Sequence, residues 1–152
     1  MELERLAYEA AIRSLDRQEE LLNELRARSG ILVGASSLAA PFLGRPALED
    51  ANLPLLIAAL AAFACAVGAS LYVLLPRRDL SFSMEGAGIY EELYPWRHDP
   101  AEIYRRLAYH LDWRWDSNNV RLDRVVRAFR VATWSLAAEV VLLLASVGVT
   151  LL

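Results

Sequence analysis

The stretch LPLLIAALAAFACAVGASLYVLL, residues 53–75, decides the fold class because none of its side chains is charged. At about 1.5 Å per residue, a helix of this length covers about 34 Å, and the hydrocarbon core of a bilayer is about 30 Å thick. The stretch therefore predicts a transmembrane helix over 53–75.

Two further runs have the same character. Residues 30–44 are uncharged, and Arg45 can extend its side chain toward the headgroups, so a span over 30–48 is long enough. Residues 131–152 carry one charged side chain, that of Glu139. The chain is 56% hydrophobic, above the roughly 45 to 50% of soluble domains. We expect an all-α integral membrane protein with three transmembrane helices.

The basic residues predict the orientation of these spans. All 16 are Arg, and they precede the span at 30–48 or lie between 77 and 130, except Arg45 in the link between the first two spans. Arginine-rich segments stay in the cytoplasm. The N-terminus and 76–130 are therefore expected inside, and the C-terminus outside. The net charge of −3 argues against a general nucleic-acid coat, and the opening residues do not have the pattern of a cleaved signal peptide.

The segments between the spans have helical and turn-like patterns. Leucines at helical spacing predict an amphipathic helix over 1–29 that runs into the first span. Prolines and glycines predict a loop over 76–99 with one short helix near 88–94. Asp99, Pro100 and Glu102 have the order of a helix start, so a basic helix over 100–130 is expected to continue into the last span.

Small residues on the first two spans predict close helix packing. These residues are Gly30, Gly34, Ser37, Pro41 and Gly44 on the first span and Ala61, Cys65 and Gly68 on the second. The single cysteine also excludes an intramolecular disulfide.

The last span has one polar face, which suggests an ion pathway. Several copies would then surround an axis, with Leu142 as an apolar constriction, since acidic rings and apolar constrictions select and gate ions. The predicted pore-lining residues are Ser135, Glu139, Leu142, Ser146 and Thr150. The alternative is structural: Glu139 is protonated or paired with a neighbouring Arg, and the hydroxyls bond to their own helix.

Arginines and aromatic residues alternate before the last span, which suggests an anionic ligand that stacks and forms ion pairs. The candidate ligand-binding residues are Arg105, Arg106, Arg114, Arg121, Arg124 and Trp113. The alternative is orientation in the membrane and attraction to anionic lipid. No pattern typical of a catalytic, metal or cofactor site was recognised, so we expect neither an enzyme nor a cofactor.

The layout resembles a group of small bacterial membrane proteins. The charged helix AIRSLDRQEELLNELRARSG, residues 11–30, feeds into paired spans, and NNVRLDRVVRAFR, residues 118–130, leads to Glu139-Val140-Val141. Asp16, Leu21 and Leu22 add a short motif. These features are similar to the transmembrane effectors of nucleotide-signalling anti-phage defence systems, of the Pycsar-type, SLATT-like or Hailong-type channel effectors.

The resemblance implies a homo-oligomer, which we take as a tetramer, in the bacterial inner membrane. A nucleotide or oligonucleotide signal, made by a cytosolic nucleotidyltransferase partner, would open an ion-conducting pore and stop the infected cell. The alternative function is a non-conducting membrane scaffold that docks a cytosolic partner protein.

Overall fold

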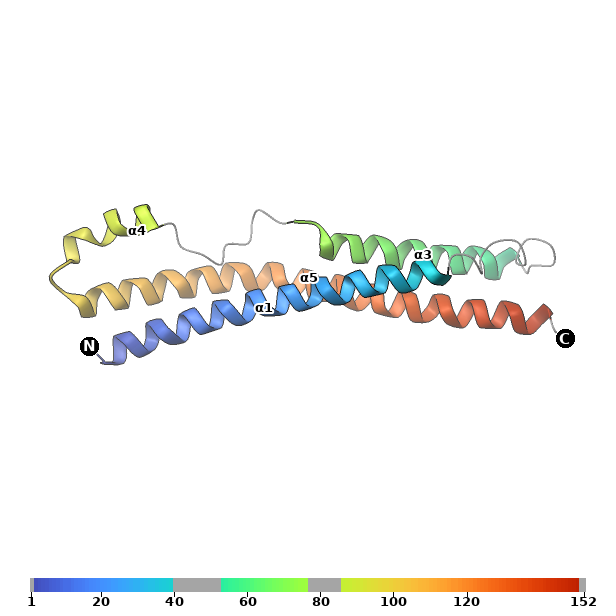
Figure 1. The fold of residues 1–152 in the computed structure, drawn as a ribbon, viewed down its shortest axis with the longest axis horizontal. Helices are drawn as coiled ribbons and strands as arrows, with labels where there is room; N and C mark the ends of the chain where they lie inside the picture. Colours follow the sequence, from blue (N-terminus) through green and yellow to red (C-terminus); the bar gives the residue numbers. More distant parts are fainter. Residues whose placement is uncertain (1, 40–52, 77–85, 151–152) are drawn as a thin grey trace. The chain divides into compact units, whose positions relative to one another are not determined.

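A computed structural model describes residues 2–39, 53–76 and 86–150 of the chain. Its elements are α1 (Glu2–Ala39), α3 (Leu53–Leu74), α4 (Gly86–Leu93), the 3-10 helix η2 (Tyr94–Trp96) and α5 (Pro100–Thr150) (Figure 1). Every element in these ranges is helical, which confirms the expected all-α class.

Among the described residues, two helices are long and apolar enough to cross a membrane. They are α3 and the part of α5 from Pro100 to Ala145. The first matches the predicted span at 53–75, and the second contains the beginning of the predicted span at 131–152. Of the predicted span at 30–48, the structure describes residues 30–39 as the last part of α1, and Pro41, Gly44 and Arg45 lie outside the described residues. The structure thus supports membrane association through two helices.

The start of α5 follows its capping residues. The Asp99 carboxylate accepts hydrogen bonds from the backbone N–H groups of Ala101 (3.1 Å) and Glu102 (3.2 Å). Pro100 occupies the first helical position, where its missing N–H costs nothing. These bonds confirm the predicted helix start. Beyond it α5 is continuous to Thr150, and the predicted short helix is α4, which begins at Gly86.

The chain forms two compact units. Unit 1 contains the described residues of 1–23 and 77–123, and unit 2 contains those of 24–76 and 124–152. In unit 1, α1 and α5 run parallel, because the Tyr8 ring lies 5.5 Å from the Tyr104 ring and the Gln18 amide donates to the Trp115 carbonyl at 3.2 Å. In unit 1, a residue of α1 therefore lies at the same height along the helix axes as the residue of α5 whose number is 96 or 97 higher.

The buried residues of the two long helices recur at spacings of three, four or seven, and we call this row the heptad seam. On α1 they are Leu15, Gln18, Leu22, Leu25, Ser29 and Ser36; on α5 they are Leu111, Asn118, Leu122, Val125, Ala132 and Glu139. Such spacing keeps one face of a helix against its partner over many turns. The seam is thus a property of each helix along most of its length.

The interior of unit 2 is small and polar, whereas its surface is large and apolar. Its buried residues include Ser29, Ser36, Ala59, Ala66, Ser70, Ala132 and Glu139; its exposed residues include Ile31, Leu38, Leu53, Ile57, Leu60, Leu71, Val131, Val141 and Leu144. Soluble bundles have the reverse arrangement, while small residues at helix contacts and large apolar residues outside are typical of bundles in lipid.

The predicted small-residue faces are not the faces buried within this chain. The exposed members are Gly30, Gly34, Ser37, Ala61, Cys65 and Gly68. A Cβ added at any of these three glycines would meet nothing within 4 Å. The buried positions are instead those of the heptad seam on α1 and Ala59, Ala66, Ser70 and Val73 on α3. On α1 the seven-residue row from Leu15 and Leu22 continues to Ser29 and Ser36, so the register set by leucines decides which small residues are buried.

Replacing the cap should weaken α5. We expect Asp99→Ala to lower the free energy of unfolding by about 1 kcal/mol, because two N–H groups lose their acceptor. Circular dichroism, which follows the helix content during denaturation in detergent, measures the change. Asp99→Asn keeps the acceptor and serves as the control. Equal losses for both variants would contradict the capping role.

Candidate functional site

Glu139 lies on the heptad seam of α5, in the apolar part of unit 2. Its exposed fraction is 0%, and both carboxylate oxygens are buried without a hydrogen-bond partner among the described residues. A carboxylate without a partner in an apolar interior is costly. An ionisable side chain at this depth in a membrane helix is by default a functional site. Glu139 is therefore the strongest single candidate in the chain.

Three serines give unit 2 further buried polar groups. Ser29 and Ser36 of α1 and Ser70 of α3 are each at most 1% exposed. The Ser29 hydroxyl oxygen is buried without a partner among the described residues. By contrast, the exposed hydroxyls of Ser37 and Thr133 donate to the carbonyls four residues earlier. The exposed hydroxyls thus bond within their own helix, whereas the buried Ser29 hydroxyl does not. The interior of unit 2 therefore contains polar groups with unused hydrogen-bonding capacity.

The predicted pore-lining residues are only partly brought together. Glu139 is fully buried inside unit 2, and Ser135 and Leu142 are half-buried beside it on the same helix. The side chains of Ser146 and Thr150 lie outside the described set. In this conformation the Glu139 carboxyl is enclosed within its own chain.

The predicted ligand-binding arginines are spread along α5. Arg105 and Arg106 lie in its second turn, Arg114 and Arg121 follow on a half-buried flank, and Arg124 belongs to unit 2. From Arg105 to Arg124 the helix rises about 28 Å at about 1.5 Å per residue. The structure thus does not gather these side chains into one anion pocket.

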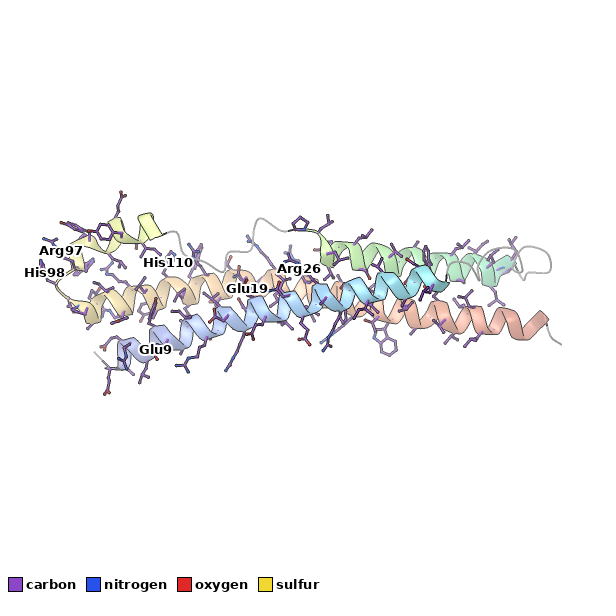
Figure 2. The ribbon with its side chains drawn as sticks, in the orientation of Figure 1. Glu9, Glu19, Arg26, Arg97, His98 and His110 are labelled. Atoms are coloured by element: carbon purple, nitrogen blue, oxygen red, sulfur yellow. The ribbon has the colours of Figure 1, made fainter. Side chains whose placement is uncertain are left out.

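Arg114 and Trp113, two of the predicted ligand-binding residues, have different neighbours. Arg114 donates from Nε to Nε2 of His110 at 3.1 Å, and both residues belong to α5, on which Figure 2 labels His110. Trp113 is 68% exposed. Asp112 and Asp116, which are also exposed, flank Trp113 in the sequence. Their negative charges oppose a phosphate that approaches the Trp113 ring.

Arg105 and Arg106 form a local network at the start of α5. Arg105 Nη2 lies 2.5 Å from Glu102 Oε2, and Arg106 Nε lies 2.7 Å from Glu102 Oε1. The Arg106 guanidinium also stacks over the Trp96 ring, 4.3 Å from its centroid. The hydrogen bond from Arg105 lowers the pKa of Glu102, with a further lowering from Arg106, while burial opposes the change. Glu102 thus pairs with two of the arginines predicted to bind a ligand and offsets one of their two positive charges.

Sequence reasoning missed two buried polar residues of unit 1, Gln18 and Asn118. They are 6% and 3% exposed and lie on the heptad seam. Extending the leucine spacing as a strict heptad would have found them, because Gln18 lies three residues after Leu15 and Asn118 lies seven after Leu111. Polar residues at such positions set register and partner choice in coiled coils.

Unit 1 also has a groove of about 520 Å³ between α1 and α5. Alanines form much of its lining, and polar side chains lie along it. The lining includes Ala7, Ala10, Ala11, Ala108, Ser14, Arg105, Tyr109 and Asp112. Small side chains leave room for another helix to approach closely.

Neither a metal-binding cluster among the described residues nor a similar protein assigns a further role to these side chains. Within 2–39, 53–76 and 86–150, no group of three His, Cys, Asp or Glu residues could hold a metal ion. Comparison with protein-family models, with curated proteins and with solved structures yields no match.

The lowered pKa of Glu102 predicts a pH-dependent stability. A carboxyl whose folded pKa is lowered stabilises the fold above its unfolded pKa of about 4.3, and this contribution is lost as the pH falls through the folded value. Between about pH 5 and pH 3, we expect the melting temperature of the wild type to fall further than that of Glu102→Gln. Glu19→Gln, which removes an exposed acid, is the control and should follow the wild type.

Proposed function

We propose that several copies of this chain assemble in the bacterial inner membrane and conduct ions through a pathway controlled by Glu139. The observation that supports this function is the buried carboxyl of Glu139, which has no hydrogen-bond partner among the described residues. Acidic side chains inside membrane helices mark ion pathways and proton relays. A purely structural residue at this position would be less costly as an alanine.

Assembly follows from the small interior of unit 2. Its buried residues are mostly small, as in helices that pack closely in lipid, and three spans are too few to enclose a conducting path easily inside one chain. Conduction therefore requires an axis between copies. The enclosed position of Glu139 corresponds to a closed state, and opening turns the face with Ser135, Glu139 and Leu142 toward that axis.

Control from the cytoplasm follows from the continuity of α5. The helix carries the heptad seam from Leu111 in unit 1 to Glu139 in unit 2 without a break. Because packed helices change register in discrete steps, a shift in unit 1 is transmitted along the same helix to Glu139. A change in the packing of unit 1 thus opens or closes the pathway.

The signal and the biological setting rest on the resemblance to anti-phage effectors. In that setting a nucleotidyltransferase partner makes a nucleotide or oligonucleotide that binds unit 1, and ion flow stops the infected cell. Arg105, Arg114 and Arg121 are the candidate contacts. The N-terminus and 76–130 then lie in the cytoplasm, and residues 30–48 form the third span.

A non-conducting scaffold is the second candidate function. It is favoured by the exposure of Tyr109 and Trp113, which are apolar enough to dock another protein. The two functions differ in one measurable property, because a scaffold passes no ions.

Ion flux from liposomes that contain the purified protein tests the proposed function. Short oligonucleotides and cyclic nucleotides serve as the activating probes, and we expect ion flux in the presence of one of them. We expect Glu139→Gln to lower this flux at least about tenfold. Thr133→Val is the matched control, because it removes an exposed hydroxyl from the same helix and should leave the flux unchanged.

Two results would contradict the pore. The first is a wild type that passes no ions with any probe in liposomes and does not depolarise cells. The second is a Glu139→Gln variant with wild-type flux. Circular dichroism of the Gln variant separates loss of conduction from loss of folding.

A further inference from the structure

Unit 1 exposes a row of large apolar residues on α5. Tyr109 is 72% exposed, Trp113 is 68% exposed and Val120 is 60% exposed. Their spacings of four and seven place them on one side of the helix, which we call the aromatic face. Contiguous exposed aromatic residues on a helix are typical of a protein contact.

A second apolar row lies on α1. Leu3, Leu6 and Leu21 are exposed, and Ala10 lies between them on the same side of the helix. We call these four residues the leucine face. The groove of unit 1 contains Leu3 and Ala10 from this face and Tyr109 from the aromatic face, so both faces border the same groove.

Lipid does not cover the aromatic face in the proposed arrangement. Trp113 lies about 27 Å along α5 from Val131, where the last predicted span begins, and Tyr109 lies about 33 Å from it. These distances place both rings well below the membrane interface where Trp and Tyr gather. Contact with another protein surface is therefore the arrangement that would bury this face.

The unpaired charges beside the two faces are opposite, while Arg105, four residues before Tyr109, pairs with Glu102 of its own helix. Asp112 and Asp116 lie beside the aromatic face, and Arg13 and Arg17 lie beside the leucine face. Asp112, Asp116 and Arg17 are exposed and have no ion pair among the described residues, while Arg13 pairs only with Glu9 of its own helix at 3.3 Å. Opposite charges beside two apolar faces, three of them without an ion pair among the described residues, indicate two halves of one interface.

The register of unit 1 brings these charges to the same level in neighbouring copies. Copies in one membrane that surround an axis along the helices are related by rotation, so each residue keeps its height in every copy. Residues of α1 and α5 whose numbers differ by 96 or 97 lie at the same height. Arg17 of one copy therefore lies at the height of Trp113 in the next copy, between Asp112 and Asp116.

We propose that the leucine face of α1 in one copy of this chain packs on the aromatic face of α5 in the next copy, with Arg17 between Asp112 and Asp116. This contact rests on the proposed assembly in one membrane. The groove of about 520 Å³ admits the neighbouring side chains because Ala7, Ala10 and Ala108 leave space. The interface also joins the two helices that carry the heptad seam.

Cross-linking between two differently labelled chains tests the contact directly. In a Cys65→Ala background, one chain carries Arg13→Cys and the other carries Tyr109→Cys, two positions at one level. We expect a disulfide-linked dimer only when both chains are coexpressed and the isolated membranes are treated with an oxidant, copper phenanthroline, which accepts the two electrons released as the thiols form the S–S bond. Glu19→Cys, which helical periodicity places on the side of α1 opposite the leucine face, replaces Arg13→Cys in the control and should not cross-link to Tyr109→Cys. Equal cross-linking by both pairs would overturn the contact.

Charge reversal tests the ion pairs. We expect Arg17→Asp to raise the concentration at which the detergent-solubilised oligomer dissociates by about tenfold, and the added changes Asp112→Arg and Asp116→Arg to restore assembly. Arg5→Asp, on another side of α1, should change it little. Light scattering after size exclusion measures the assembly.

The outcomes separate this contact from the proposed function. A wild type that is monomeric in membranes overturns both. An oligomer that conducts ions, yet is insensitive to Arg17→Asp and forms no disulfide between the Arg13→Cys and Tyr109→Cys chains, overturns the contact alone. A specific cross-link and charge rescue without ion flux support the contact and remove the pore.

Discussion

The heptad seam of α1 and α5 is the constraint on which the rest of the structure depends. Leucines at spacings of three and four bind the two helices in unit 1, where burying apolar side chains removes them from water. The same spacing continues into unit 2, where two helices are apolar enough to cross a membrane and burial of leucine would no longer stabilise helix contacts in lipid. Beyond Leu25 and Val125, the seam there contains serine, alanine and Glu139.

That change of solvent explains why one helix carries two kinds of contact. In unit 1 the seam holds Leu111, Asn118 and Leu122, as in a soluble coiled coil. In unit 2 it holds Ala132 and Glu139, and the large apolar residues are on the outside. A seven-residue repeat also places Glu139 among the buried positions, so a polar group that lipid would expel is retained by the register of the leucines.

The polar groups of the seam have different consequences. Gln18 and Asn118 specify pairing at a cost in stability, as single polar residues do in coiled coils. Glu139 has no partner among the described residues, which makes its position dependent on the packing around it. One repeat along α5 thus carries both Asn118 and Glu139, so the two polar positions share a single helix face.

The sequence alone determined the helical class, the apolar stretches at 53–75 and 131–152 and the capped start at Asp99, because these follow from local hydropathy and local hydrogen bonding. It did not determine which small residues of the first two spans are buried within the chain, since Gly30 and Ser29 are both small and only a partner helix decides between them. The tertiary structure decided which face is buried, dispersed the candidate arginines along α5 and paired Arg105 with Glu102. These are relations between side chains whose separation depends on helix register, which composition and hydropathy do not determine.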